Sequence, residues 1–174
     1  MFKARIQTSF VQMKPNQDGS FPIDETDRLL LSILQENAEF SLAELGKKVN
    51  LTKMAVSNRM KRLKKLGIIE GSCYKLNPEK LGQDYVVISR VTCSYKGFEQ
   101  EKIANAIAKF PGVMSVYLVF GTSDILLIAR RKDKKSAKQL LYDISKIQGV
   151  RNTITMIPHT VIKESLMIDL QSRT

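Results

Sequence analysis

The segment LGKKVNLTKMAVSNRMKRLKKLG, residues 45–67, combines a helical pattern with a high density of positive charge. It contains eight Lys or Arg residues and no Asp or Glu. Thr52 is suited to cap a helix, because its hydroxyl can accept a hydrogen bond from a free N–H of the first turn. Val56, Met60 and Leu63 then recur at i, i+4 and i+7, which is one face of an α-helix. The pattern predicts a basic helix that follows Thr52 and ends at Gly67.

The opposite face of this helix offers cations together with amide and hydroxyl groups, which neutralise phosphates and read base edges. We expect Lys53 and Lys65 to lie nearer the phosphates and Arg59, on the flank, to be partly structural with Glu44 as partner. A solvated, lysine-rich surface helix is the alternative interpretation. The candidate DNA-binding residues are Thr52, Lys53, Met54, Ser57, Asn58, Lys61, Arg62 and Lys65.

Two further helices are predicted upstream of the basic helix. In the first, acidic residues at the N-terminal end suit the helix dipole, and the apolar stripe is expected to be Leu29, Leu30, Ile33 and Leu34. In the second, Ser41 and Glu44 form a capping box, and Leu42, Leu45 and Val49 should face inward. Three helices with this spacing, the last of them basic, predict a helix-turn-helix domain over residues 23–67.

Composition sets limits on compartment and partners. The 174 residues are 43% hydrophobic and 26% charged, with a net charge of +11. Positive charge is shared evenly between the halves, so the cluster near residues 47–65 marks where an anion would dock. Cys73 and Cys93 have no metal-ligand spacing and favour a reducing compartment. No apolar run is long enough to span a bilayer, so we expect a cytoplasmic protein that does not bind a membrane.

The regions that flank the helix-turn-helix are weakly patterned. Residues 1–22 are expected to be an N-terminal extension, and residues 164–174 a C-terminal tail. Between Gly67 and the second half, Ile68, Ile69, Tyr74 and Leu76 predict a short strand within a linker over residues 68–83.

The second half contains a repeat. KFPGVMSVYLV, residues 109–119, aligns with KIQGVRNTITM, residues 146–156, at an offset of 37. Each copy follows a predicted helix, over 99–110 and 135–147, and each helix follows a predicted strand, over 85–94 and 124–131. Residues 84–163 are therefore expected to form a ferredoxin-like βαββαβ domain, which makes the whole chain α+β.

Two helices cover only one face of a four-stranded sheet, yet these strands are apolar on both faces. A large uncovered apolar face marks an interface, and self-association covers it most simply. We therefore expect a homodimer, whose two-fold axis would also pair the DNA-reading helices.

The run from Ile23 to Lys163 resembles the Lrp/AsnC, or feast/famine, transcription regulators. The resemblance rests on IDETDRLLLSILQENAEFSLAELGKKVNLTKMAVSNRMKRLKKLGII, then LNPEKLG, then VYLVFGTSDILL. It implies an N-terminal helix-turn-helix domain, winged-helix-like, and a C-terminal ligand-binding domain. It also implies dimers that assemble into higher oligomers such as octamers, with amino acids bound between dimers.

The family's effector loop usually reads T-G-x-Y-D, and residues 120–124 stand there as Phe-Gly-Thr-Ser-Asp. The resemblance implies that Asp124 holds a cationic group and that N–H groups near Gly121 hold a carboxylate. Ser123 in place of Tyr implies a changed ligand preference. Both Gly121 and Asp124 also have a purely structural explanation as turn residues. The candidate effector-binding residues are Gly121, Thr122, Ser123, Asp124, Thr153 and Thr155.

The favoured function is that of a sequence-specific regulator that binds double-stranded DNA, with an amino acid or related small molecule as candidate effector. An architectural, chromatin-like DNA-binding protein is one alternative. An enzyme like the siroheme decarboxylases, which resemble this family, is less favoured, because His159 is the only histidine and has no neighbouring carboxylate or Cys cluster. No catalytic residue, metal ligand or cofactor is predicted.

Overall fold

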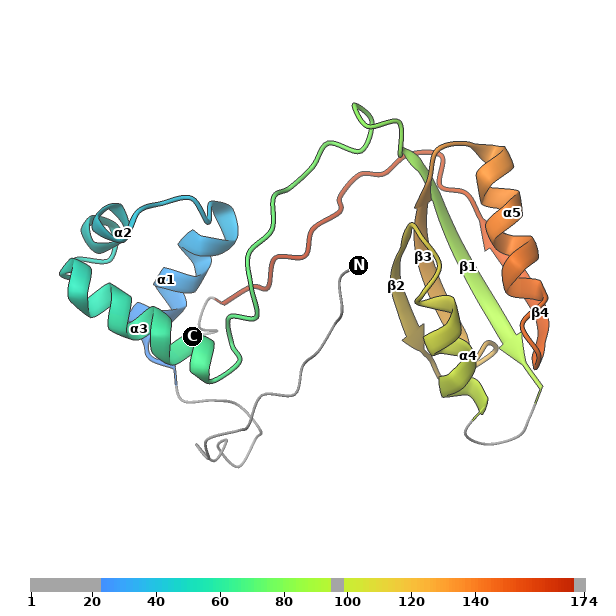
Figure 1. The fold of residues 1–174 in the computed structure, drawn as a ribbon, viewed down its shortest axis with the longest axis horizontal. Coiled ribbons are helices and arrows are strands. Elements are labelled where there is room, and N and C mark those ends of the chain that lie inside the picture. The colour runs from blue at the N-terminus through green and yellow to red at the C-terminus, as the bar shows by residue number, and fades with distance from the viewer. Residues whose placement is uncertain (1–22, 95–98, 171–174) are drawn as a thin grey trace. The chain divides into compact units, whose positions relative to one another are not determined.

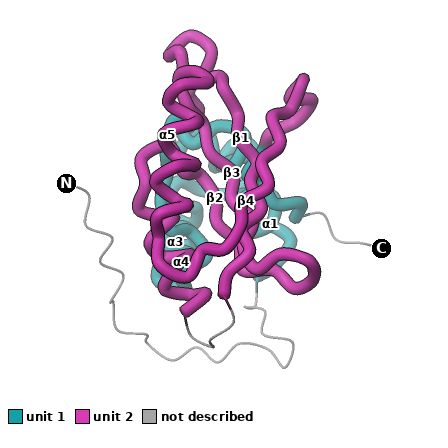
Figure 2. Tube along the Cα trace, turned by 90° about the vertical axis from the view of Figure 1, so that its right-hand side faces the viewer, with its two compact units in different colours: residues 1–74, 165–174 teal, residues 75–164 magenta. Residues whose placement is uncertain are grey.

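The computed structural model describes residues 23–94 and 99–170, so the expected N-terminal extension lies outside the described residues. The chain forms two compact units (Figures 1 and 2). Unit 1 comprises residues 1–74 together with 165–174, and unit 2 comprises residues 75–164. The chain therefore passes between the units twice, at Tyr74–Lys75 and again at Glu164–Ser165.

Unit 1 contains the three expected helices: α1 (Glu25–Glu36), α2 (Leu42–Lys48) and α3 (Lys53–Lys65). The predicted caps are confirmed. The Ser41 hydroxyl accepts from Glu44 N at 3.2 Å while Glu44 Oε2 accepts from Ser41 N at 2.7 Å, and Thr52 Oγ1 accepts from Ala55 N at 3.2 Å. These bonds satisfy N–H groups that the first turns of α2 and α3 leave free.

The buried face of α1 differs from the predicted stripe. Leu29 is 48% exposed, whereas Leu30 and Leu31 are buried. The inward face runs through Asp27, Leu30, Leu31 and Leu34, which is an i, i+3, i+4, i+7 series beginning with a carboxylate. Because an acidic residue occupies the first inward position, the spacing of apolar residues alone does not predict this face of α1.

The turn between α2 and α3 depends on two backbone features. Asn50 adopts a left-handed conformation, with φ of 54°. Leu51 N donates to Gly46 O at 2.8 Å, which brings the turn so close to α2 that a Cβ at Gly46 would lie 2.5 Å from Leu51 O. Only glycine fits there, and the close turn fixes how α3 leaves α2.

The strand predicted within residues 68–83 is absent, and with it any strand that would form a wing in unit 1 of the described chain. Ile68 and Ile69 instead turn back onto the helical core, and both of their N–H groups donate to Leu63 O. Tyr74 and Leu76 are 78% and 67% exposed. The apolar residues of this segment thus complete unit 1 or face solvent rather than joining a sheet.

The C-terminal segment, residues 165–170, is an integral part of unit 1. The Gln35 side chain on α1 forms two hydrogen bonds with the backbone of Ile168. Its amide nitrogen donates to the Ile168 carbonyl at 3.0 Å, and its amide oxygen accepts from the Ile168 N–H at 2.6 Å. Leu170 packs against the core of the three helices. The helix-turn-helix unit is therefore built from two pieces of chain that are separated in the sequence by the whole of unit 2, residues 75–164.

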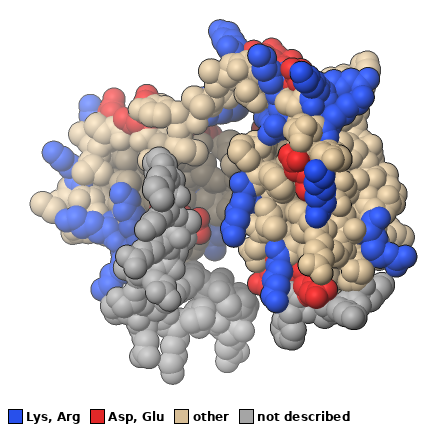
Figure 3. Space-filling model, turned by 45° about the vertical axis from the view of Figure 1, so that its right-hand side comes forward, with Lys and Arg blue, Asp and Glu red and all other residues tan. Residues whose placement is uncertain are grey.

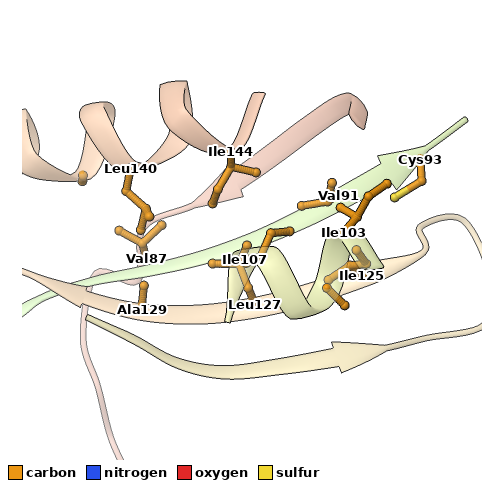
Figure 4. Close-up of a cluster of buried hydrophobic side chains, with 12 residues drawn as sticks. Val87, Val91, Cys93, Ile103, Ile107, Ile125, Leu127, Ala129, Leu140 and Ile144 are labelled. Carbon is orange, nitrogen blue, oxygen red and sulfur yellow. The ribbon is translucent and has the colours of Figure 1, made fainter. Parts of the chain in front are cut away.

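Unit 2 is an antiparallel sheet of β1 (Tyr85–Cys93), β2 (Val113–Leu118), β3 (Ile125–Arg131) and β4 (Val150–Met156), in the order β2-β3-β1-β4. Helices α4 (Glu99–Ile107) and α5 (Lys134–Ser145) cover one face (Figure 1). This arrangement confirms the predicted ferredoxin-like plan. Val87, Val91, Ile125 and Leu127 of the sheet meet Ile103, Ile107, Leu140 and Ile144 of the helices (Figure 4).

The glycines of the sequence repeat are explained by the turns that lead into β2 and β4. Gly112 and Gly149 have φ of 79° and 93°, a region that favours glycine. A Cβ at Gly112 would lie 2.5 Å from Arg130 O, and one at Gly149 would lie 2.9 Å from a methyl carbon of Ile103. Each turn is pressed against its neighbour and excludes a side chain.

The other face of the sheet carries no helix. Because paired residues of antiparallel strands share a face, one row on it runs through Tyr117, Leu126, Arg90 and Ile154. The next row runs through Ser115, Ile128, Ile88 and Met156. Tyr117, Ile154 and Met156 are about half exposed, at 51%, 47% and 47%. The face is thus mainly apolar, with Arg90 at its centre and Arg130, which pairs with Val86, in a further row.

Candidate DNA interface and effector loop

The exposed side of α3 carries most of the predicted DNA-binding residues. Met54, Asn58, Lys61 and Lys65 recur at intervals of 4, 3 and 4, and all are exposed, with Met54 at 70%. Thr52 and Lys53 are exposed at the helix start, and Ser57 is half-buried beside the stripe. Lys64, which is not among the predicted DNA-binding residues, is exposed as well. A helix with this composition can place cations on phosphates and amide and hydroxyl groups on base edges.

Arg62 lies apart from this group. Its Nη2 pairs with Oδ2 of Asp27, a carboxylate whose side chain is 0% exposed. Arg59 joins the same cluster: its Nη1 lies 2.8 Å from Asp27 Oδ1 and 2.5 Å from Asp24 Oδ2. The expected structural role of Arg59 is confirmed, but Glu44 as its partner is wrong, because that carboxylate caps α2. Two arginines of α3 therefore hold the helix against the start of α1.

The cluster also affects protonation. The hydrogen bond from Arg59 lowers the pKa of Asp24 below its ordinary value of 3.8, and the same bond raises the pKa of Arg59. A carboxyl group with a lowered pKa in the folded state stabilises the fold above its unfolded pKa. That contribution is lost as the pH falls through the lower folded pKa, so it is present in full at neutral pH.

The effector loop joins β2 to β3. Gly121 has φ of 122° and is exposed with Thr122, whereas Ser123 is buried at 8% exposure. The Asp124 carboxylate accepts from Cys93 N at 2.7 Å through one oxygen and from the Gln100 side-chain amide at 2.6 Å through the other. Asp124 therefore fixes the end of β1 and the start of α4 to the loop. No sequence pattern indicates Gln100 or Cys93 as partners of Asp124, because these contacts arise only once the sheet forms.

The two threonines of β4 are separated from the loop. Thr153 and Thr155 pair with Val91 and Ser89 of β1, while the loop precedes β3 on the other side of β1. The Thr155 hydroxyl lies 3.0 Å from that of Ser89, in a hydrogen bond within the sheet. Strand β1 therefore lies between these threonines and β3, which follows the loop.

The remaining candidates show no arrangement for catalysis. His159 is exposed, and its Nδ1 lies 2.7 Å from the Thr160 hydroxyl. Cys93 packs in the core of unit 2, and burial raises the pKa of its thiol, whereas Cys73 is exposed. No group of three His, Cys, Asp or Glu residues that could hold a metal occurs in the described ranges. Across those same ranges, no helix has the length and apolar character needed to cross a membrane.

Comparisons with known proteins agree with this geometry. Residues 23–64 match the AsnC-type helix-turn-helix domain, and residues 86–168 match the Lrp/AsnC ligand binding domain. A helix-turn-helix transcriptional regulator of Pyrococcus furiosus is 37% identical over 147 residues, covering 83% of this chain and 97% of the relative. The chain belongs to the Lrp/AsnC family. This Lrp/AsnC protein is thus a helix-turn-helix transcription regulator with a ligand-binding domain.

Solved structures support the same assignment. A transcriptional regulator of Neisseria meningitidis, in complex with L-Met, has a TM-score of 0.81 and 27% identity, covering 86% of this chain and 97% of that one. AsnC of E. coli has a TM-score of 0.77 and 22% identity, covering 84% and 99%. The second likeness shows the shared fold.

The buried carboxylate predicts a large loss of stability when its charge is removed. Asp27→Asn should lower the free energy of unfolding by about 2–4 kcal/mol, because it leaves Arg59 and Arg62 without their shared counter-charge. Asp24→Asn is the matched control; that side chain is 51% exposed, and its loss should cost about 0–1 kcal/mol. Chemical denaturation followed by circular dichroism measures both, and equal losses in the two variants would contradict the role of Asp27.

Proposed function

We propose that this Lrp/AsnC regulator reads double-stranded DNA with the exposed stripe of α3. The observation that carries the proposal is that the basic residues of α3 fall into two groups, one in ion pairs with α1 and one exposed. Arg59 and Arg62 are held by Asp24 and Asp27, whereas the stripe of Met54, Asn58, Lys61 and Lys65 is exposed. The helix also ends with its cations in the last turn, where they suit the dipole.

Each residue of α3 has a distinct proposed role. Asn58 and Lys61 contact base edges, with Ser57 beside them and Met54 supplying an apolar contact at the same surface. Lys53 and Lys65 contact phosphates, and Thr52 caps the helix and offers its exposed end to the backbone of the DNA. Arg62, whose guanidinium is shared with Asp27, positions the helix rather than reading bases.

The assignment predicts two kinds of DNA-binding defect. Asn58→Ala should cost about 1–3 kcal/mol on the preferred sequence and relax preference at one base pair. Lys65→Ala should weaken binding to all sequences alike and reduce the salt dependence by about one phosphate contact. Binding to a selected operator and to randomised duplex would be compared by fluorescence anisotropy. Unchanged operator preference in Asn58→Ala would refute base reading there, and a wild-type protein without any preference would favour an architectural role.

We also propose that the uncovered sheet face is the surface on which two copies of the chain associate. The rows through Arg90 and Ile88 present apolar side chains that water leaves unfavourably exposed in a monomer. Arg90 Nε is buried and has no hydrogen-bond partner in the described structure. A second copy would cover the apolar rows and bring acceptors to Arg90. Such dimers, assembled further, would match the octamers that the family resemblance implies.

Association through this face predicts that one charge will disrupt it. Ile154→Lys, in the row with Arg90, should convert the oligomer to a monomer, because it places a second cation in an apolar interface. Ile162→Lys is the control, since Ile162 is 90% exposed and lies outside the sheet. Light scattering at micromolar concentration gives the mass of each variant. A monomeric wild-type protein, or an unchanged mass for Ile154→Lys, would reject the interface.

For the effector, we propose that the loop of residues 121–124 binds an amino acid when two copies bring their loops together. Support comes from the neighbouring regulator solved with L-Met and from the chemistry of the loop. Each oxygen of Asp124 accepts one hydrogen bond, and a carboxylate can accept about four in all, so lone pairs remain for an ammonium group. Thr153 and Thr155 would contribute from the neighbouring part of the assembly.

The effector proposal predicts a thermal shift. An amino acid that binds the folded assembly stabilises it by about 2.7 kcal/mol at a hundredfold excess over Kd. Screening the common amino acids, beginning with L-Met, should give at least one increase in melting temperature. Asp124→Asn should remove the shift, while Asp143→Asn, a control carboxylate on α5, should keep it. If no amino acid changes the melting curve, the loop serves the fold alone, and DNA reading by α3 is unaffected.

A further inference from the structure

Helix α5 carries a basic stripe along its solvent side. Lys135, Lys138, Tyr142 and Lys146 recur at intervals of 3, 4 and 4, which places them in one line on a helix, and all four are exposed. Ala137, Leu140 and Ile144 occupy the opposite, buried side. We refer to the four exposed residues as the α5 stripe. Figure 3 shows Lys and Arg side chains, in blue, distributed over the visible surface, with fewer Asp and Glu side chains in red among them.

The α5 stripe is extended, and its lysines form no salt bridge in the described part of the chain. From Lys135 to Lys146 it spans about 17 Å, at 1.5 Å per residue. The carboxylates near it are engaged: Asp133 caps the helix by accepting from Ser136 N at 2.7 Å, and Asp143 accepts from the Gln139 side chain at 2.9 Å.

The stripe includes an aromatic ring in a specific arrangement. Tyr142 is 55% exposed, and Lys146 Nζ lies 4.1 Å from the centre of its ring. This contact holds the lysine on the helix surface, so its charge is directed outward with less freedom than that of an isolated side chain. An exposed ring flanked by cations is suited to a polyanionic surface.

Helix stability does not explain the lysines at the start of α5. Lys134 and Lys135 stand in the first turn of α5, which has no acidic residue, and there the helix dipole disfavours cations. In α3 the cations Arg62, Lys64 and Lys65 stand in the last turn, where the dipole favours them. Lys135 is therefore placed where the dipole disfavours a cation, whereas Lys146, at the C-cap of α5, stands where the dipole favours one.

We propose that the α5 stripe is a second contact to DNA, which holds the phosphate backbone of the duplex that α3 reads. This inference rests on the proposed function of α3 and extends it to unit 2. Lysines bind phosphates as point charges without reading bases, so the contact is independent of sequence. Because α3 already tethers the duplex to the same chain, the second contact acts at high effective concentration. An acidic protein partner has no comparable tether.

The test compares two triple variants of equal charge. Lys135→Gln, Lys138→Gln and Lys146→Gln together remove the stripe, and Lys102→Gln, Lys109→Gln and Arg151→Gln remove three exposed cations of unit 2 that lie outside α5. The affinity of full-length protein for a long operator duplex is measured between low and physiological salt. The slope of log K against log salt should fall by about 2–3 for the stripe variant, at ~0.9 per phosphate. The control variant should keep the wild-type slope, and both should keep the wild-type operator preference.

The outcomes separate this inference from the function of α3. A stripe variant whose slope equals that of the wild type overturns the inference, while a wild-type operator preference keeps the function of α3 intact. Equal falls in both triple variants mean a general charge effect and overturn it as well. Binding of wild-type protein to poly-glutamate, lost in the stripe variant with an unchanged DNA slope, would assign the stripe to an acidic protein instead. Absence of any DNA binding by the wild type would remove both proposals.

Discussion

The pairing of Asp27 with Arg59 and Arg62 is the constraint on which the DNA-binding unit depends. Asp27 is fully buried, so its charge requires partners, and both partners come from α3, the helix whose exposed side is proposed to read DNA. Rotation of α3 would break these ion pairs, and translation along its axis would do the same. The buried cluster thus fixes which residues of α3 face outward. Some basic residues of α3 form ion pairs with α1, and others are exposed. Only the contacts in the folded structure distinguish the two groups.

In unit 2, a single carboxylate likewise connects several elements. Asp124 joins β1, α4 and the loop through two hydrogen bonds, so the loop is anchored at its end while Gly121 and Thr122 remain exposed. The sheet behind the loop is packed on one face and open on the other. If the proposed association through this face and the proposed ligand binding at the loop both hold, the anchored loop would couple assembly to ligand binding.

Much of this could be predicted from local patterns. Capping residues, helical spacing and the repeated Gly-Val turns predicted the helices, most of the strands and their succession along the chain, because each signal lies within a few residues. The predictions failed where distant residues decide the outcome. Leu29 was preferred over Leu31 because the inward face of α1 begins with an acid, and the strand near Tyr74 was predicted although no neighbouring strand pairs with it. The pairing of Arg62 with Asp27 spans 35 residues and leaves no local trace.

The hydrogen bonds between Gln35 and Ile168, together with the packing of Leu170, have a consequence for biosynthesis. Residues 23–67 leave the ribosome first, yet their core receives Leu170 only after all of unit 2 has been made. The nascent helix-turn-helix therefore lacks part of its packing until the ligand-binding unit is available to fold. A regulator made in this order completes its DNA-binding unit last, after its ligand-binding domain has been synthesised.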